Sequence, residues 1–246
     1  MRKGTLRQIL LITDGCSNHG EDPVAIAALA KEKGITVNVI GILSRNEAYG
    51  EHGLKEVEDI AMSGGGISQI VYANQLAQTV KMVTQKAMTQ TIHGMINKEL
   101  THILGEGQQM EDLPPEKRGQ VMEVVDEFGE MVDLEVLILV DISASMDDKL
   151  PTVQESLIDL SISLNSRTGN NLFAIYAFPG KRQPIDRLID WDPQLDSLVK
   201  TFKKISTGGI TPTGPALREA LELFSEKRSK QELLGGDDEY IEESGS

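Results

Sequence analysis

The stretch LEVLILVDISASM, residues 134–146, decides the fold. Its apolar run, residues 136–140, leads without interruption into Asp141, Ser143 and Ser145. A strand without polar alternation is covered on both faces, which is typical of parallel sheets in α/β proteins. Ligands of such sheets bind at the carboxyl ends of the strands. We therefore expect these three oxygen-bearing side chains to lie in a crevice at the protein surface.

One carboxylate and two hydroxyls make a donor set that suits a hard cation. Mg²⁺ takes oxygen ligands in near-octahedral geometry at about 2.0–2.1 Å and usually keeps several waters. Hydroxyl ligands add no negative charge, so the ion stays electrophilic towards a carboxylate from another molecule. Asp and Ser are also common helix N-caps, and a capped turn is the alternative interpretation of Asp-x-Ser-x-Ser. These residues alone leave both interpretations open.

Composition limits the classes of function that the chain can have. Its 246 residues, 39% of them hydrophobic, suffice for one large domain or two small ones. The formal net charge of -14 disfavours binding to nucleic acid or to an anionic membrane. Cys16 is the only cysteine, which excludes an internal disulfide and fits a reducing compartment. The early apolar run, residues 9–12, is too short for a signal peptide, and no run approaches a membrane span. We expect a cytoplasmic protein.

Strands and helices alternate in the first part of the chain. A second buried-type strand, residues 8–13, ends in Asp14, and Asp22 with Pro23 then provides an N-cap and a first helical residue. The pattern β-α-β-α-β-α continues to residue 94 and predicts a parallel sheet with crossover helices.

The remainder divides into three parts. Residues 95–133 are helical by pattern and offer no strand, which predicts a helical connector packed on the sheet, with a docking site for a partner as the less favoured alternative. Residues 134–228 alternate again, with an edge strand at 185–189 and a helix beginning near Pro193. Residues 229–246 are acidic and rich in Gly and Ser, and we expect a disordered tail.

A loop before the last predicted helix carries another hydroxyl. Residues 206–214 read STGGITPTG and open a helix over residues 215–224. A threonine held there, beside a helix N-terminus, lies where it could reach the crevice of Asp141. Thr211 and Thr213 are the two threonines next to this helix start.

Three segments resemble the metal-site motifs of the von Willebrand factor type A domain, which form its metal-ion-dependent adhesion site. They are DISASM at 141–146, GGITPTGPAL at 208–217 and LLITDG at 10–15. Ala144 stands where the family commonly has glycine. The resemblance implies a doubly wound, mostly parallel α/β sheet flanked by helices, with Mg²⁺ or Mn²⁺ as the ion. The ligands that it implies are Asp141, Ser143, Ser145, Thr211 and Asp14. The resemblance favours Thr211 over Thr213, because Thr211 precedes the proline as in a T-P-x-G variant of the family motif.

The order of the motifs departs from that of the family. There Asp-x-Ser-x-Ser comes first and the ITDG-type strand last, whereas here Asp14 precedes Asp141. Residues 1–94 resemble the carboxyl half of such a domain and residues 134–228 the amino half, so we predict a circular permutation joined by the connector. A domain-swapped dimer is the rival hypothesis, and two separate incomplete domains would leave sheet edges uncovered.

The resemblance implies a protein-binding module in which a partner protein contributes a Glu or Asp to the ion. The alternative is a metal-dependent phosphoester or ester hydrolase, with Cys16 or His19 beside Asp14 as nucleophile or base. The sequence has no P-loop, no basic cluster for a phosphate and no ligand spacing typical of catalytic zinc. We therefore expect a binding protein and not an enzyme.

Overall fold

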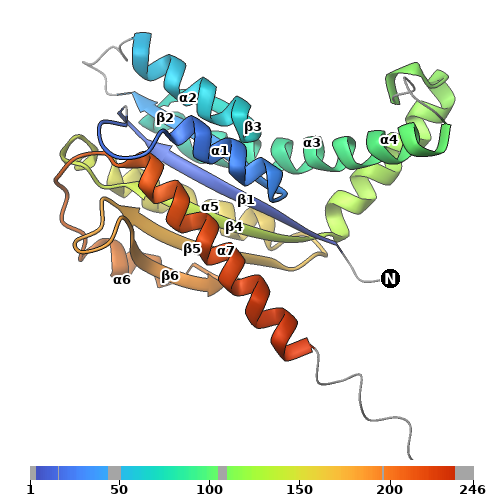
Figure 1. Ribbon diagram of the computed structural model, residues 1–246. Coiled ribbons are helices and arrows are strands. Elements are labelled where there is room, and N and C mark those ends of the chain that lie inside the picture. Colours follow the sequence, from blue (N-terminus) through green and yellow to red (C-terminus); the bar gives the residue numbers. More distant parts are fainter. Residues whose placement is uncertain (1–3, 16, 44–50, 105–109, 196, 236–246) are drawn as a thin grey trace, which may run out of the picture.

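A six-stranded sheet with the order β3-β2-β1-β4-β5-β6 forms the centre of the molecule (Figure 1). The computed structural model describes residues 4–15, 17–43, 51–104, 110–195 and 197–235. All neighbouring strands are parallel except β5 and β6. The strands are β1 (Thr5–Thr13), β2 (Ile35–Leu43), β3 (Gly65–Tyr72), β4 (Asp133–Asp141), β5 (Asn171–Phe178) and β6 (Asp186–Asp192). The predicted mostly parallel α/β sheet is confirmed.

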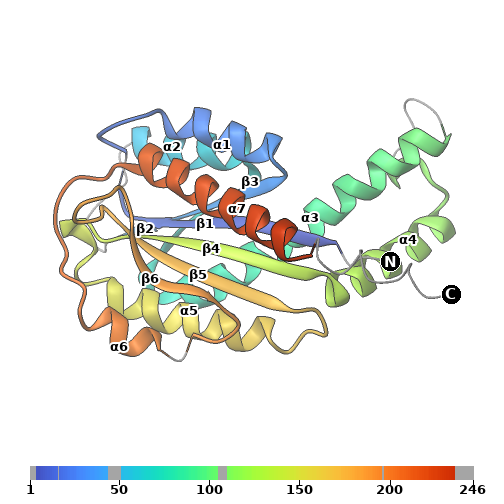
Figure 2. The ribbon, with the colours of Figure 1, turned by 60° about the horizontal axis from the view of Figure 1, so that its bottom comes forward.

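Helices cover both faces of the sheet (Figure 2). One face carries α1 (Pro23–Glu32), α2 (Glu51–Ser63) and α7 (Thr213–Gly235). The opposite face carries α3 (Leu76–Leu104), α5 (Leu150–Leu164) and α6 (Leu198–Phe202). The helix α4 (Pro115–Met131) follows α3 and precedes β4. The predicted flanking of the sheet by helices is therefore also confirmed.

The uninterrupted apolar runs of β1 and β4 reflect this double cover. In β4, Val136 and Ile138 join the core under α3 and α5, whereas Leu137 joins the core under α1 and α7. In β1, Leu10 and Leu11 divide between the two cores in the same way. Each fully buried side chain of this size contributes about 1.5–3 kcal/mol relative to exposure. Because successive strand residues point to opposite faces, both faces need apolar residues at every position.

The chain leaves the two central strands in opposite directions. From β1 it proceeds outward to β2 and β3, and from β4 it proceeds to β5 and β6. Right-handed crossovers then place the following helices on opposite faces, α1 on one and α5 on the other. The carboxyl ends of β1 and β4 therefore flank a topological switch point, the place where open α/β sheets bind ligands.

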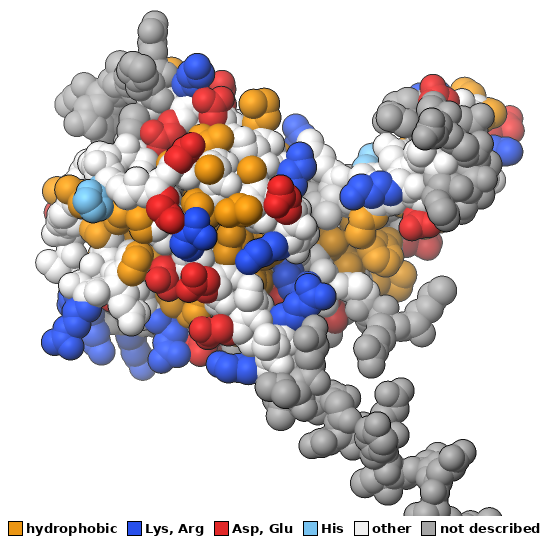
Figure 3. Space-filling model, viewed as in Figure 1, with side chains coloured by type: hydrophobic (Ala, Val, Ile, Leu, Met, Phe, Trp, Pro, Cys, Tyr) orange, Lys and Arg blue, Asp and Glu red, His pale blue; other side chains and the backbone are white. Residues whose placement is uncertain are grey.

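The predicted connector is a helical hairpin. The helix α3 continues without a break from Leu76 to Leu104. The predicted boundary between residues 94 and 95 therefore lies inside this helix. The far part of α3 and α4 project beyond the sheet (Figures 1 and 2). Between them lies an apolar hollow of about 420 Å³, which includes Met95 and Val124 (Figure 3). Arg167 holds the base of α4, since its guanidinium donates to the carbonyl oxygens of Gly129 and Val132.

Some predicted boundaries differ from the structure. The helix expected near Pro193 begins at Leu198 as α6, and α7 continues through Gly235, so residues 229–235 of the predicted tail are helical. Residues 236–246 lie outside the described part of the chain. In the described residues, no helix carries the long uncharged apolar run that a membrane span requires.

Candidate functional site

Asp141 ends β4 inside the protein, with no exposed surface. The Thr13 hydroxyl, at the end of β1, donates to Asp141 Oδ2 at 2.6 Å, and the backbone N–H of Ser143 donates to Oδ1 at 2.8 Å. Burial raises the pKa of the Asp141 carboxyl, and these two hydrogen bonds oppose the rise. The site therefore holds a carboxylate whose charge a nearby cation would stabilise.

A chain of hydroxyls connects the Asp141 loop to Asp14. Ser145 Oγ donates to Asp14 Oδ1 at 2.8 Å, and Ser143 Oγ lies 3.2 Å from Ser145 Oγ. The Ser143 hydroxyl also hydrogen-bonds to the Asp141 carboxylate and opposes the rise in its pKa, so the two serines link the two carboxylates. A hydroxyl oxygen that donates its hydrogen still has lone pairs, so both serines remain able to ligate a cation.

Lys149 is part of this cluster, and the sequence did not indicate it. Its ammonium group contacts Asp14 Oδ2 and donates to the backbone carbonyl of Ser145 at 2.8 Å. The Lys149 side chain is 4% exposed and the Asp14 side chain 1% exposed, so this ion pair is buried. Lys149 follows two acidic residues at the start of a helix, a pattern that is equally typical of a solvated lysine.

The loop that carries Thr211 is tied to both neighbouring loops. The backbone N–H of Thr211 donates to Asn18 Oδ1 at 2.9 Å, and the N–H of Asn18 donates to the Thr211 carbonyl at 3.1 Å. The N–H of Gly208 donates to the Ile142 carbonyl at 2.9 Å. Thr211 is buried, and so is Thr213, whose hydroxyl has no hydrogen-bond partner among the described residues. Asn18 is thus a second residue that sequence reasoning missed.

Four of the five predicted ligands are linked to one another by hydrogen bonds, and the fifth lies next to them. Asp14, Asp141, Ser143 and Ser145 belong to one hydrogen-bonded cluster, which Thr211 adjoins through the backbone bonds of its loop. Within the described residues, no three His, Cys, Asp or Glu side chains converge as a metal-binding group. A cation held here would therefore depend on the serine and threonine hydroxyls. That donor set fits a hard ion such as Mg²⁺, which accepts neutral oxygen ligands and waters.

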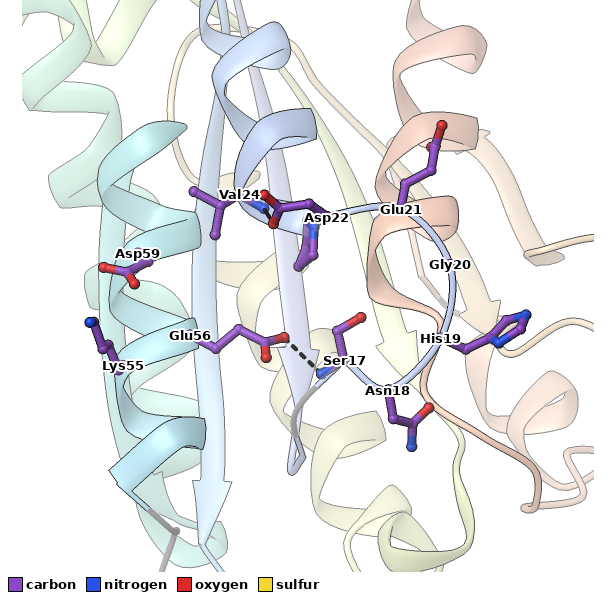
Figure 4. A pocket seen from close by; sticks show the side chains of 11 residues that line it. Ser17, Asn18, His19, Gly20, Glu21, Asp22, Val24, Lys55, Glu56 and Asp59 are labelled. Carbon is purple, nitrogen blue, oxygen red and sulfur yellow. Dashed lines mark hydrogen bonds between the residues drawn. The ribbon is translucent and has the colours of Figure 1, made fainter.

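A cavity of about 760 Å³ lies between the β1–α1 loop and α2 (Figure 4), and Asn18, which is hydrogen-bonded to Thr211, is one of its lining residues. Glu56 Oε1 accepts from the backbone N–H of Ser17 at 2.7 Å, and burial raises the pKa of Glu56. His19 is exposed, and its ring is turned away from Glu56 and Ser17 (Figure 4). Cys16 lies outside the described residues. Polar and charged side chains therefore make up most of the lining of this cavity.

Comparison with known proteins adds three findings. The sequence model of the von Willebrand factor type A domain matches residues 1–86. The "Uncharacterized protein YabS" of Bacillus subtilis (strain 168) is 62% identical over 245 residues, covering 100% of both chains. The crystal structure of an uncharacterized protein from Alicyclobacillus acidocaldarius is 41% identical with a TM-score of 0.83, covering 92% of this chain and 96% of that one. The chain therefore belongs to the family of YabS, and its residues 1–86 match the von Willebrand factor type A domain.

Proposed function

We propose that this protein is a metal-ion-dependent protein-binding module. A divalent cation, Mg²⁺ or Mn²⁺, binds between the carboxyl ends of β1 and β4 and presents an open coordination position to a Glu or Asp of a partner protein. The five residues that hold it are Asp14, Asp141, Ser143, Ser145 and Thr211. The ion supplies an electrophilic site for a carboxylate, and the chain orients that site and selects the partner.

The hydrogen bond from Ser145 to Asp14 carries this proposal. It joins residues 131 positions apart at 2.8 Å. Ser145 and Asp14 thus bring together two motifs that form one metal site in the von Willebrand factor type A domain, which this chain resembles. A capped turn would explain the bond from the Ser143 N–H to Asp141, but it would require no second buried carboxylate from β1.

The proposal includes a circular permutation of the family's motif order. In its support, β1 and β4 of the same chain pair in parallel from Thr5 with Asp133 to Ile12 with Val140. The helical hairpin of α3 and α4 then joins the segments that would be the ends of an unpermuted domain. A domain swap would use the same pairing between two chains, and a mass measurement that finds only monomer in solution would exclude it.

The charge of the site supports an acidic ligand group on the partner. The hydroxyl ligands are neutral, and carboxylates that act through water neutralise little of the positive charge of a divalent ion. A further carboxylate, from the partner, therefore binds well to the ion. Glu56, Asp59 and Lys55 line the cavity between the β1–α1 loop and α2 and provide side chains of both signs there. These residues could distinguish one acidic partner from another.

Thermal unfolding with and without metal tests the proposal. An ion at about 100 times its dissociation constant stabilises the folded state by roughly 2.7 kcal/mol. We expect Mg²⁺ or Mn²⁺ to raise the Tm of the parent protein above its value in chelator. Asp14→Ala and Asp141→Ala should each abolish this rise.

Asp190→Ala is the matched control, because Asp190 is an exposed carboxylate paired with Arg187 on β6. It should keep the full metal-dependent rise in Tm. A parent protein that does not respond to metal, or an Asp14→Ala variant that responds as the parent does, would contradict the proposal.

A further inference from the structure

The ion pair between Lys149 and Asp14 affects how a metal ion can bind at Asp14. Both oxygens of the Asp14 carboxylate are engaged by groups of this chain, Oδ1 by the Ser145 hydroxyl and Oδ2 by the Lys149 ammonium. A divalent cation that approaches Asp14 therefore meets a carboxylate that already has a cationic partner.

The ion pair is too deeply buried to be an incidental surface contact. The two side chains are 4% and 1% exposed, and an exposed pair would contribute little. A buried pair is different, because removing one partner leaves the other charge uncompensated in a medium of low dielectric constant. Lys149 is also anchored by a second bond, to the carbonyl oxygen of Ser145. The chain thus supplies its own cation at the point where Asp14 and Ser145 meet.

We infer that Lys149 is a tethered counterion that competes with the divalent cation for Asp14. Without metal, its ammonium group neutralises Asp14 and keeps the two loops together. With metal, the ion and the ammonium group repel each other across a short distance, so Lys149 must give up Asp14. This inference rests on the proposed function, and it assigns Lys149 a role in setting how tightly the site binds its ion.

The inference makes opposite predictions for stability and for affinity. Lys149→Met removes the positive charge and leaves Asp14 without its partner, so the variant should melt below the parent in chelator. The same change removes the competitor, so its dissociation constant for Mn²⁺ should fall at least about tenfold. Lys149→Gln is a second variant, whose neutral amide keeps a hydrogen-bond donor and which should also bind Mn²⁺ more tightly.

Lys227→Met is the matched control. Lys227 Nζ lies 2.8 Å from Glu135 Oε1 and 3.8 Å from the centre of the Trp191 ring, at the other end of β4. This variant also loses one ion-paired ammonium group and one unit of charge. It should lose stability in chelator, but its affinity for Mn²⁺ should equal that of the parent.

Free Mn²⁺, measured by electron paramagnetic resonance in titrations of the full-length protein, gives the dissociation constants directly. Tighter binding by both Lys149 variants and not by Lys227→Met is the expected result. If the parent binds Mn²⁺ and the Lys149 variants bind it equally or more weakly, Lys149 supports Asp14 instead of competing for it, and this inference is overturned alone. If neither the parent nor any variant binds, the metal site itself is refuted, and the inference with it.

Discussion

The bond from Thr13 to Asp141 makes a quantitative prediction about the buried carboxylate. Thr13→Val keeps the shape and strand propensity of the side chain but removes the hydroxyl, which donates to Asp141 Oδ2 at 2.6 Å and accepts from the Gly15 N–H at 3.3 Å. Hydrogen bonds to charged groups contribute about 1.5–3 kcal/mol, so we expect a loss of ~2 kcal/mol at pH 7 in chelator. For a chain of this length, each kcal/mol lowers the Tm by about 2–4 °C. The variant should therefore melt about 4–8 °C below the parent.

The loss of stability in Thr13→Val should depend on pH. The bond favours the ionised form of Asp141 and so lowers its pKa, against the effect of burial. Its extra contribution is present above the folded-state pKa of Asp141 and is lost as the pH falls through that value. The difference in unfolding free energy between Thr13→Val and the parent should therefore shrink towards about 1 kcal/mol in acid, the value for a neutral hydrogen bond.

Thr84→Val is the matched control for this change. Thr84 is fully buried, and its hydroxyl donates to the neutral carbonyl of Val80 at 2.9 Å. Thr84→Val should lose at most about 1 kcal/mol. The loss should not depend on pH between about 4 and 8, because neither the hydroxyl nor the carbonyl titrates there. Equal losses for the two variants, measured by denaturant unfolding at several pH values, would refute the assignment of Asp141 as a buried carboxylate.

Two further predictions concern the loops around the site. A Cβ on Gly214 would lie 1.9 Å from the carbonyl oxygen of Glu21, so Gly214→Ala should separate α7 from the β1–α1 loop and reduce the metal-dependent rise in Tm. Gly119→Ala is the control, because Gly119 faces open space on α4, and it should leave that rise unchanged. An unchanged rise in both variants would contradict the role of this contact. Burial raises the pKa of Glu56, so its ionisation opposes folding, and the stability that this group contributes is lost as the pH rises through its folded-state pKa. Glu56→Gln should therefore be more stable than the parent at pH 7 by about 0.5 kcal/mol at most, because the group is half exposed, and this gain should vanish below about pH 4; a gain that persists in acid would show that charge is not its cause.

Much of the fold could be predicted because its signals are local. The apolar runs of β1 and β4 need cover on both faces, and the caps around Pro23 mark a helix start that the structure has at the same residue. The sequence pattern also predicts a helix over about residues 150–164, and α5 has these bounds. The sequence pattern predicts a short strand from Gln69, after the glycines at 64–66, whereas β3 begins at Gly65. Three consecutive glycines are typical of a break between elements. At Gly66, however, a Cβ would lie 2.1 Å from the Val37 carbonyl oxygen, so glycine is what allows β3 to approach β2.

The parts of the site that could not be predicted depend on contacts between distant segments. Asn18 holds both backbone groups of Thr211, although the two residues are 193 positions apart. Lys149 pairs with Asp14 across 135 positions. Neither residue belongs to a motif, and an asparagine in a loop or a lysine at a helix start is ordinary in any surface segment. The parallel pairing of β1 with β4 brings Asp14 and Lys149 together, and the packing of α7 against α1 brings Thr211 to Asn18.

The position of a bound ion tests the central claim most directly. Anomalous diffraction from crystals grown with Mn²⁺ should show one strong peak within ligand distance, about 2.0–2.2 Å, of the hydroxyl oxygens of Ser143 and Ser145. Asp14 and Asp141 should flank that peak from the ends of β1 and β4. A peak at the exposed carboxylates of Asp147 and Asp148 instead, or no peak near β1 and β4 at saturating Mn²⁺, would contradict the account.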